Sequence, residues 1–226
     1  MQIRLMSFNT QSCKNYIEQK TDIAIMAKAI AQCGAEIIGL QEMYEQNGEG
    51  SFGRQTKLLA EKLGYEHYYF AKAITIGNGN GYGNGLISKY PILSAETVLI
   101  PKPEVRGYDG YYEDRCLLKA TLDVNGTKLN VLVIHFGLNP DEAENAVKTV
   151  IANLPGEKTV LMGDFNLPPE SQLLLPIREK LFDTAALFAG VTAPENTKLS
   201  HPSDAPKVKI DYIFTSPDIK VLCADI

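Results

Sequence analysis

The stretch Thr159-Val160-Leu161-Met162-Gly163-Asp164-Phe165-Asn166 sets the interpretation of the whole sequence. Its apolar run is typical of a buried strand, and Gly163 allows the backbone to turn sharply where that strand ends. Asp164 and Asn166 would then be held at the mouth of a sheet, where rigid strands often position catalytic groups. A simple turn capped by Asp and Asn explains the same residues equally well. The stretch alone therefore leaves both interpretations open.

Length and composition favour one large domain over residues 1–226, because 45% hydrophobic content can build a substantial core. The net charge is -5 and the pI is near 5.3. Proteins that grip the phosphate backbone are usually basic overall or along one face, so binding to nucleic acid is disfavoured.

The cysteines and the apolar segments indicate the cellular compartment of the protein. The four cysteines are widely separated and include no Cys-x-x-Cys pair, so we expect reduced thiols. The sequence begins without the apolar region of a signal peptide and has no apolar run long enough to cross a bilayer. We therefore expect a cytoplasmic protein without membrane insertion.

Strands and helices alternate along the chain, and turn signals separate them. The pair Asn125-Gly126 predicts a hairpin, and glycine at every second position from Gly77 to Gly85 predicts a mobile loop. A helix should begin after Thr21 or Asp22. Strands are expected at 2–8, 36–42, 65–70, 86–88, 115–124, 127–136, 159–162 and 209–214, and helices at 23–33, 55–63, 140–151 and 173–189, the last broken at Pro176.

Polar side chains recur at the ends of these strands or inside them. Oxygen ligands with a single histidine suit a hard cation, Mg²⁺ or Mn²⁺, better than zinc. A cation with a carboxylate base suits hydrolysis of a phosphate ester. A lone histidine in a strand is more often structural, whereas an acid inside an apolar strand is costly to bury unless something binds it. The set comprises Asn9, Glu42, His135, Asp164, Asn166 and Asp211.

Six segments in order resemble the motifs of the endonuclease/exonuclease/phosphatase superfamily, which is deoxyribonuclease I-like. Each is weak alone, but their order along the chain makes the match specific. The resemblance implies an α/β fold, a four-layer α/β/β/α sandwich. The segments are Ser7-Phe8-Asn9, Gly39-Leu40-Gln41-Glu42, residues 82–91, Val133-Ile134-His135, Gly163-Asp164-Phe165-Asn166 and Ile210-Asp211-Tyr212-Ile213-Phe214.

The resemblance also implies roles for individual residues. Glu42 would be a Mg²⁺ ligand, with Asn9 beside it. Asp164 would orient or deprotonate the attacking water, and Asn166 would hydrogen-bond the scissile phosphate. His135 would contact phosphate or assist proton transfer.

Two further residues are expected to bind substrate. Asn84 matches a polar position near the cleft of the family. Arg115 would contact phosphate, with an ordinary surface charge as the equally weighted alternative.

The sequence departs from the family at its end. Family members carry a Ser-Asp-His motif on a further strand, and the chain reaches Ala224-Asp225-Ile226 without one. The acid matching Asp211 pairs with that histidine in the family, and neither His67 nor His201 lies in its place. We therefore expect Asp211 to lack a partner and turnover by this chain to be impaired.

Three functions follow from these observations. The leading one is a Mg²⁺-dependent phosphoesterase acting on a small soluble phosphoester. A protein that binds a phosphorylated ligand without turnover is the first alternative, and a DNA nuclease is the second. The oligomeric state stays open.

Overall fold

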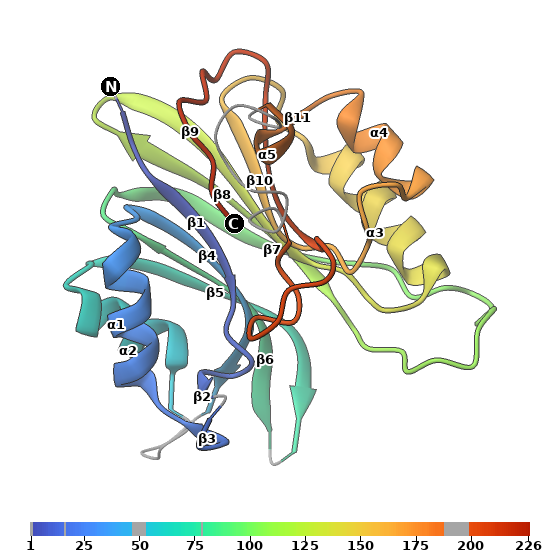
Figure 1. Ribbon diagram of the computed structural model, residues 1–226, viewed down its shortest axis with the longest axis horizontal. Coiled ribbons are helices and arrows are strands. Elements are labelled where there is room, and N and C mark those ends of the chain that lie inside the picture. Colours follow the sequence, from blue (N-terminus) through green and yellow to red (C-terminus); the bar gives the residue numbers. More distant parts are fainter. Residues whose placement is uncertain (1, 16, 47–52, 78, 188–198) are drawn as a thin grey trace.

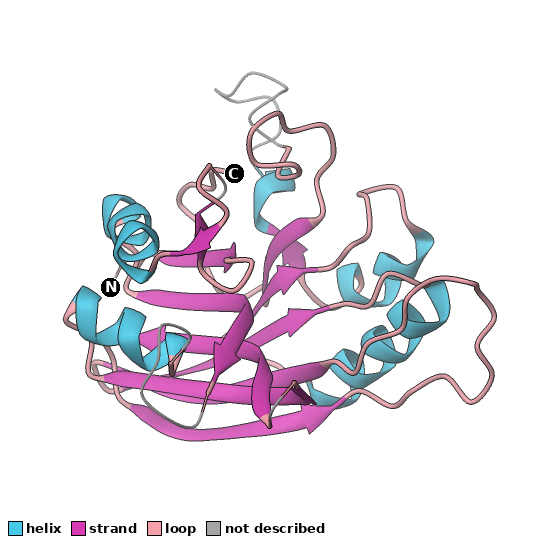
Figure 2. Ribbon diagram, turned by 90° about the horizontal axis from the view of Figure 1, so that it is seen from below, coloured by secondary structure: helices cyan, strands magenta, loops and turns pink. Residues whose placement is uncertain are grey.

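Two β-sheets lie face to face, and helices cover their outer surfaces (Figures 1 and 2). The computed structural model describes residues 2–15, 17–46, 53–77, 79–187 and 199–226. The expected four-layer α/β/β/α sandwich is confirmed. One sheet has the strand order β1-β4-β6-β5 and the other β11-β12-β10-β9-β8-β7.

The four-stranded sheet contains the first of the polar strand ends. Its strands are β1 (Leu5–Asn9), β4 (Ile37–Glu45), β6 (Asn80–Ser88) and β5 (His67–Ile76). The strand β1 runs parallel to β4, with Asn9 opposite Gln41. A small hairpin of β2 (Lys14–Asn15) and β3 (Lys20–Thr21) follows β1.

The six-stranded sheet contains the remaining polar strand ends. Its strands are β7 (Ile92–Leu99), β8 (Cys116–Val124), β9 (Thr127–His135), β10 (Thr159–Asp164), β11 (Phe182–Asp183) and β12 (Asp211–Thr215). The strands β8 and β9 form the hairpin expected at Asn125-Gly126. The strand β10 pairs in parallel with β9 and antiparallel with β12.

Helices α1 (Ile23–Cys33) and α3 (Pro140–Asn153) begin where local capping predicts. Helix α1 follows Asp22, whose Oδ1 accepts hydrogen bonds from the backbone N–H groups of Ala24 and Ile25. Helix α3 begins with a capping box between Asn139 and Glu142. Helices α1 and α2 (Gln55–Leu63) cover the four-stranded sheet, and α3 and α4 (Leu175–Arg178) cover the six-stranded one (Figure 1). None of the described helices has the length and apolar character needed to cross a membrane.

The core between the sheets is tightly packed. It includes Leu86, Leu118, Val133 and Met162, all completely buried. A Cβ atom at Gly39 would lie 2.7 Å from the Met162 sulfur. The two sheets therefore approach closely at the point where β4 faces β10, and this places their polar ends near one another.

Two expectations from the sequence were wrong. The glycine-alternating stretch forms most of β6 instead of a mobile loop, because its glycines face crowded neighbours. A Cβ at Gly83 would collide with the Ala71 carbonyl oxygen, and one at Gly85 would lie 2.8 Å from Thr56 Oγ1. Pro176 does not break a long helix: it lies in the first turn of the short α4, where proline is tolerated.

The rest of that expected helix is replaced by short elements. A 3₁₀ turn at Gln172–Leu174 precedes α4, and α5 (Thr184–Leu187) follows β11. Residues 188–189, at the end of the expected helix, lie outside the described part of the chain.

Gly163 is required where β10 meets β9. Its φ angle is 154°, and a Cβ atom there would collide with the carbonyl oxygen of Ile134 on the neighbouring strand. The next pair in this register is Asp164 opposite His135. The glycine thus permits the backbone approach that brings these two side chains to one sheet end.

We expect Gly163→Ala to lower the free energy of unfolding by at least roughly 2 kcal/mol, because the new methyl group displaces a paired strand. Gly64→Ala is the matched control. Gly64 also has a positive φ angle, 71°, but a Cβ atom added there would meet nothing within 4 Å, so it should cost about 1 kcal/mol. Urea denaturation of both variants measures the difference, and equal losses would contradict the role given to Gly163.

Candidate active site

The Asn9 side chain joins the two sheets. Its Nδ2 donates hydrogen bonds to Glu42 Oε1 at 2.8 Å and to Asp164 Oδ2 at 3.1 Å. Glu42 lies in a bulge of β4, where the pairing with β6 shifts between Leu40 and Met43, and its φ angle is 58°. The bulge turns Glu42 away from the regular strand. One amide group therefore holds two carboxylates that come from opposite sheets.

The loop after β1 fixes this arrangement from the other side. Gln11 donates its backbone N–H to Asn9 Oδ1 at 3.1 Å, which sets the orientation of the amide. Ser12 donates its backbone N–H to the carbonyl oxygen of Glu42 at 3.0 Å. The positions of Asn9 and Glu42 are thus set by backbone contacts as well as by each other.

Asp164 is buried, with 5% of its surface exposed. Its Oδ1 accepts the backbone N–H of Asn166 at 2.9 Å, as in the turn expected from the sequence. Burial raises the pKa of Asp164 to about 6, and the charge of Asp211 adds to the effect, while the hydrogen bond from Asn9 opposes it. The turn and active-site interpretations of this stretch are therefore compatible, because the turn holds the carboxylate in the cluster.

His135 lies beside Asp164. Its Nε2 is 3.7 Å from Asp164 Oδ2 and 3.3 Å from Asn166 Nδ2. Its Nδ1 is 2.9 Å from an Arg115 guanidinium nitrogen. Burial and the Arg115 charge hold the pKa of His135 well below its usual range. The ring is therefore neutral around pH 7.

Asp211 occupies the strand position opposite Asp164. Burial raises its pKa, while a hydrogen bond with Ser200 and the charge of Lys209 act in the opposite direction. Lys209 forms a buried ion pair with Asp183, with Nζ and Oδ2 2.7 Å apart. This pair anchors the chain just before Asp211.

The structure does not bring Asn84 into this cluster. It is 3% exposed, and its Nδ2 donates to the Cys116 carbonyl oxygen at 2.8 Å. Asn84 lies on β6 and Cys116 on β8, so the hydrogen bond connects the two sheets beneath the site. This contact commits the Asn84 Nδ2 to backbone, and the expected contact of Asn84 with substrate stays a prediction.

Two residues near the cluster were missed at the sequence level. Glu113 Oε1 lies 2.9 Å from the same Arg115 nitrogen that contacts His135. Burial raises the pKa of Tyr82, and the nearby charges of Glu42 and Glu113 add to the effect. Glu113 lies in a polar loop with several other charged residues, although its position two residues before Arg115 could have predicted an ion pair. Tyr82 was hidden among the alternating glycines.

A resident divalent cation would depend mainly on Glu42. Within the described residues, no cluster of three or more His, Cys, Asp or Glu side chains could hold a metal ion. Mg²⁺ often binds through only one or two carboxylates and keeps several water molecules. The partly exposed Glu42, held by the Asn9 amide, fits this mode of binding.

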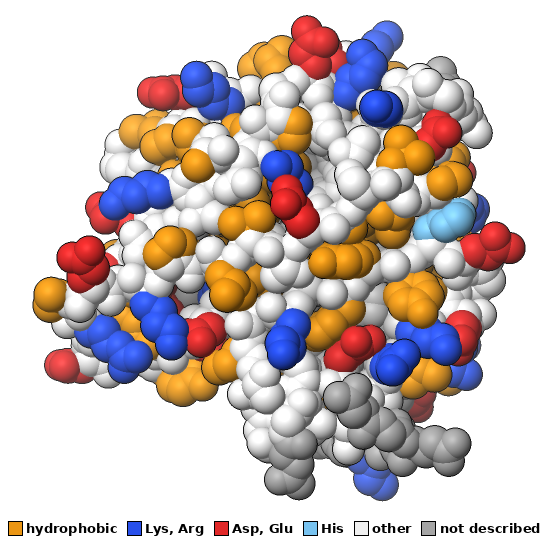
Figure 3. Space-filling view, turned by 180° about the vertical axis from the view of Figure 1, so that it is seen from behind, with side chains coloured by type: hydrophobic (Ala, Val, Ile, Leu, Met, Phe, Trp, Pro, Cys, Tyr) orange, Lys and Arg blue, Asp and Glu red, His pale blue; other side chains and the backbone are white. Residues whose placement is uncertain are grey.

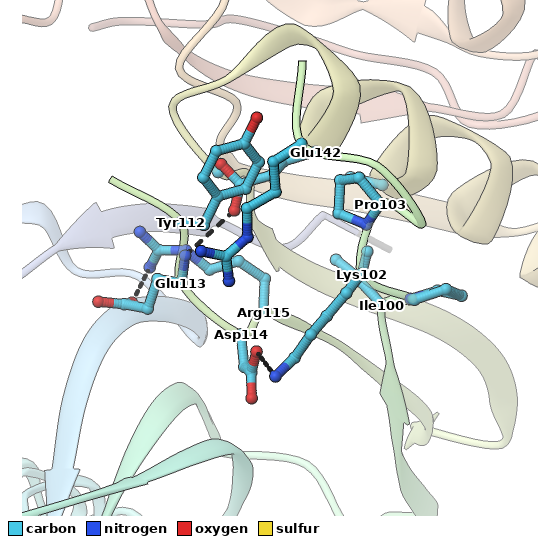
Figure 4. Close-up of a pocket in the computed structure, with 12 residues that line it drawn as sticks. Ile100, Lys102, Pro103, Tyr112, Glu113, Asp114, Arg115 and Glu142 are labelled. Atoms are coloured by element: carbon cyan, nitrogen blue, oxygen red, sulfur yellow. Dashed lines mark hydrogen bonds and ion pairs between the residues drawn. The ribbon is translucent and has the colours of Figure 1, made fainter. Parts of the chain in front are cut away.

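Two hollows lie near the cluster. A groove of about 780 Å³ is lined by Gln11 and Ser12, which contact the cluster, and extends along the β2–β3 hairpin. A small cavity of about 30 Å³ lies behind Arg115 and Glu113, under the loop before β8 (Figure 4). Asp164, Glu42 and Asn9 do not line that cavity.

Several solved structures share this fold, and the similarity to each covers nearly the whole chain. An endonuclease/exonuclease/phosphatase from Beutenbergia cavernae is 24% identical with a TM-score of 0.79, covering 98% of this chain and 66% of that one. A family protein from Leptotrichia buccalis is 19% identical with a TM-score of 0.71, covering 94% and 87%. The mannosyl-6-phosphatase from Bacteroides thetaiotaomicron is 16% identical with a TM-score of 0.69, covering 96% and 86%.

These structural matches establish the fold, and this chain spans less than two thirds of the Beutenbergia chain. No curated protein matches the sequence. The sequence profile of the endonuclease/exonuclease/phosphatase family, however, matches residues 6–226. The chain therefore belongs to the endonuclease/exonuclease/phosphatase family.

Proposed function

We propose that the protein is a divalent-cation-dependent phosphoesterase in which Asp164 activates water for attack on phosphorus. The observation that carries the proposal is the buried Asp164 carboxylate. Asn166 and Asn9 hold its two oxygens at 2.9 and 3.1 Å, and its pKa is raised to about 6. A carboxylate with a pKa near the working pH is suited to accept a proton from water.

The neighbouring residues supply complementary functions. His135 and Asn166 present nitrogen atoms beside Asp164, where a phosphoryl oxygen would bear charge in the transition state. Asp211 faces Asp164 across the strand pair and adds negative charge that favours proton uptake by Asp164. Arg115 acts on this group through His135.

Glu42 would hold the divalent cation, Mg²⁺ or Mn²⁺, with Asn9 fixing the orientation of the carboxylate. When bound, such a cation neutralises charge on phosphoryl oxygens and orients the substrate. Tyr82 lies close enough to Glu42 for its pKa to be raised by the Glu42 charge. The Asn9 bridge also keeps Glu42 and Asp164 together despite their like charges.

The surroundings favour a small anionic substrate. The groove that starts at Gln11 and Ser12 contains Lys14 and Lys20, two cations suited to an anionic or polyhydroxylated group next to the scissile phosphate. One of the solved relatives is named as a mannosyl-6-phosphatase, which supports a small phosphoester.

Extended nucleic acid fits the surface less well. The net charge is -5, and Figure 3 shows acidic and basic side chains interspersed over one face of the molecule. The face in this view lacks the continuous basic stripe typical of proteins that track a phosphate backbone.

The four free cysteines suit a reducing compartment, which supports placing the protein in the cytoplasm.

The raised pKa of Asp164 predicts how stability depends on pH in metal-free buffer. The folded state keeps this proton up to about pH 6, whereas the unfolded chain releases it near pH 4. Stability from this group is thus full below about pH 4 and lost as the pH rises through about 6, by up to roughly 3 kcal/mol. Asp164→Asn should lack this decline, measured by urea denaturation between pH 4 and 7. Parallel profiles for the two proteins would refute it.

Binding of the divalent cation should depend on Glu42. At a Mg²⁺ concentration about 100 times the dissociation constant, we expect the melting temperature to rise by roughly 5 to 10 °C. Glu42→Gln should abolish most of this rise, whereas Glu61→Gln, which removes an exposed acid on α2, should leave it intact. An equal rise in Glu42→Gln would exclude Glu42 as the main ligand.

Hydrolysis should be measured on p-nitrophenyl phosphate, bis-p-nitrophenyl phosphate, sugar phosphates and plasmid DNA, each with Mg²⁺ or Mn²⁺. We expect a small phosphoester to be cleaved and Asp164→Asn to lower the rate by about 10² to 10⁴-fold. Asp218→Asn, three residues beyond the opposite end of β12, is the control. Phosphate binding without turnover would instead favour a binding protein and overturn the proposal. Nicking of plasmid alone would favour a nuclease and overturn the small soluble substrate.

A further inference from the structure

The contact between Arg115 and His135 restricts the state of the imidazole. A guanidinium group only donates hydrogen bonds and does not lose its proton in proteins. One of its terminal nitrogens lies 2.9 Å from His135 Nδ1, a normal hydrogen-bond distance. Nδ1 must therefore accept, and a neutral imidazole that accepts at Nδ1 carries its single proton on Nε2.

The other two states of the ring conflict with this contact. A proton on Nδ1, in either the other tautomer or the imidazolium ion, would point an N–H group at another N–H group 2.9 Å away. In the imidazolium ion, two positive charges would also face each other in a buried place. The lowered pKa of His135 is consistent with this conflict.

Glu113 forms an ion pair with Arg115, although its Oε1 accepts no hydrogen bond from the described residues. The guanidinium nitrogen that contacts His135 also lies 2.9 Å from Glu113 Oε1, and Figure 4 shows Arg115 extending toward this carboxylate. The side chains of Arg115 and Glu113 are only 12% and 16% exposed. Little freedom is left for the guanidinium to turn away from the ring.

The second ring nitrogen faces another donor. Asn166 Nδ2 lies 3.3 Å from His135 Nε2, and its contact with the Phe136 carbonyl oxygen at 3.0 Å sets which end of the amide points to the ring. With a proton on Nε2, these two nitrogens are both donors and do not bond each other. Both can instead direct an N–H group to one shared acceptor, with Asp164 Oδ2 3.7 Å from Nε2.

We propose that Arg115 is a positioning residue that fixes His135 as the neutral tautomer with its proton on Nε2, so that His135 and Asn166 form a two-donor seat for an anionic oxygen. Only the naming of that oxygen as phosphoryl rests on the proposed function. In this arrangement His135 is a hydrogen-bond donor and does not accept a proton from water. That task is left to Asp164.

The tautomer can be read directly by NMR. Long-range ¹H–¹⁵N correlation spectra of the metal-free full chain at pH 7 separate protonated from unprotonated ring nitrogens. The chain has three histidines, and His67→Gln and His201→Gln variants assign their signals. We expect His135 to show an unprotonated Nδ1 and a protonated Nε2. A proton on Nδ1, or on both nitrogens, would overturn the inference.

The role of Arg115 needs a variant. Arg115→Met should let the ring populate the tautomer with a proton on Nδ1, and Glu113→Gln/Arg115→Met serves if the unpaired buried acid prevents folding. Lys102→Met, which removes an ion pair with Asp114 in the same loop, should leave the His135 spectrum unchanged. An unchanged tautomer in the folded Arg115 variants would show that Arg115 does not set it.

The anion seat is tested with inorganic phosphate. Titration should shift the His135 Nε2–H and the Asn166 side-chain amide signals together, with one dissociation constant. If neither signal shifts when phosphate is added, His135 and Asn166 do not form an anion-binding site. These measurements are independent of turnover, so a failed hydrolysis assay would count against the proposed function and leave the tautomer assignment standing.

Discussion

The site depends on one hydrogen-bonding group, the Asn9 amide, which lies between the carboxylates of Glu42 and Asp164. These acids belong to different sheets, so their separation follows from how the sheets pack. That packing is close, since a methyl group at Gly39 would already press on Met162. Without the amide, two acids would approach each other in a partly desolvated place, where like charges repel strongly. The Asn9 bridge therefore depends on the close packing of the two sheets, and it holds the two carboxylates near each other.

The six-stranded sheet places acidic groups on one side of Asp164 and an arginine–histidine pair on the other. Asp164 and Asp211 face each other at the end of β10 and β12, which favours proton uptake by Asp164. A chain of Glu113, Arg115 and His135 approaches the same carboxylate from the other side. The charge of Arg115, which lies just before β8, thereby acts on His135, the neighbour of the proposed base Asp164. Further polar contacts lie outside the reacting region: Lys209 with Asp183 and Asn84 with Cys116 brace the strands.

Much of this could be predicted where the determining physics is local. Asp22 and Asn139 cap helices through contacts within three residues, and the Asn125-Gly126 turn forces a hairpin. The polar residues at strand ends also indicated the cluster, since Asn9, His135 and Asp164 are the last residues of β1, β9 and β10. Long-range packing was not accessible. The glycines of β6 look like a loop until Ala71 and Thr56 are placed against them, and Glu113 gains significance only when Arg115 is seen to contact His135.

If Asp164 directs water to phosphorus, as we propose, the bond that breaks lies between phosphorus and oxygen. The most direct measurement is hydrolysis of a phosphomonoester in H₂¹⁸O, followed by mass spectrometry of both products. We predict one ¹⁸O atom in the inorganic phosphate and none in the alcohol. Label in the alcohol, or the absence of any hydrolysis with Mg²⁺ and Mn²⁺, would contradict the account.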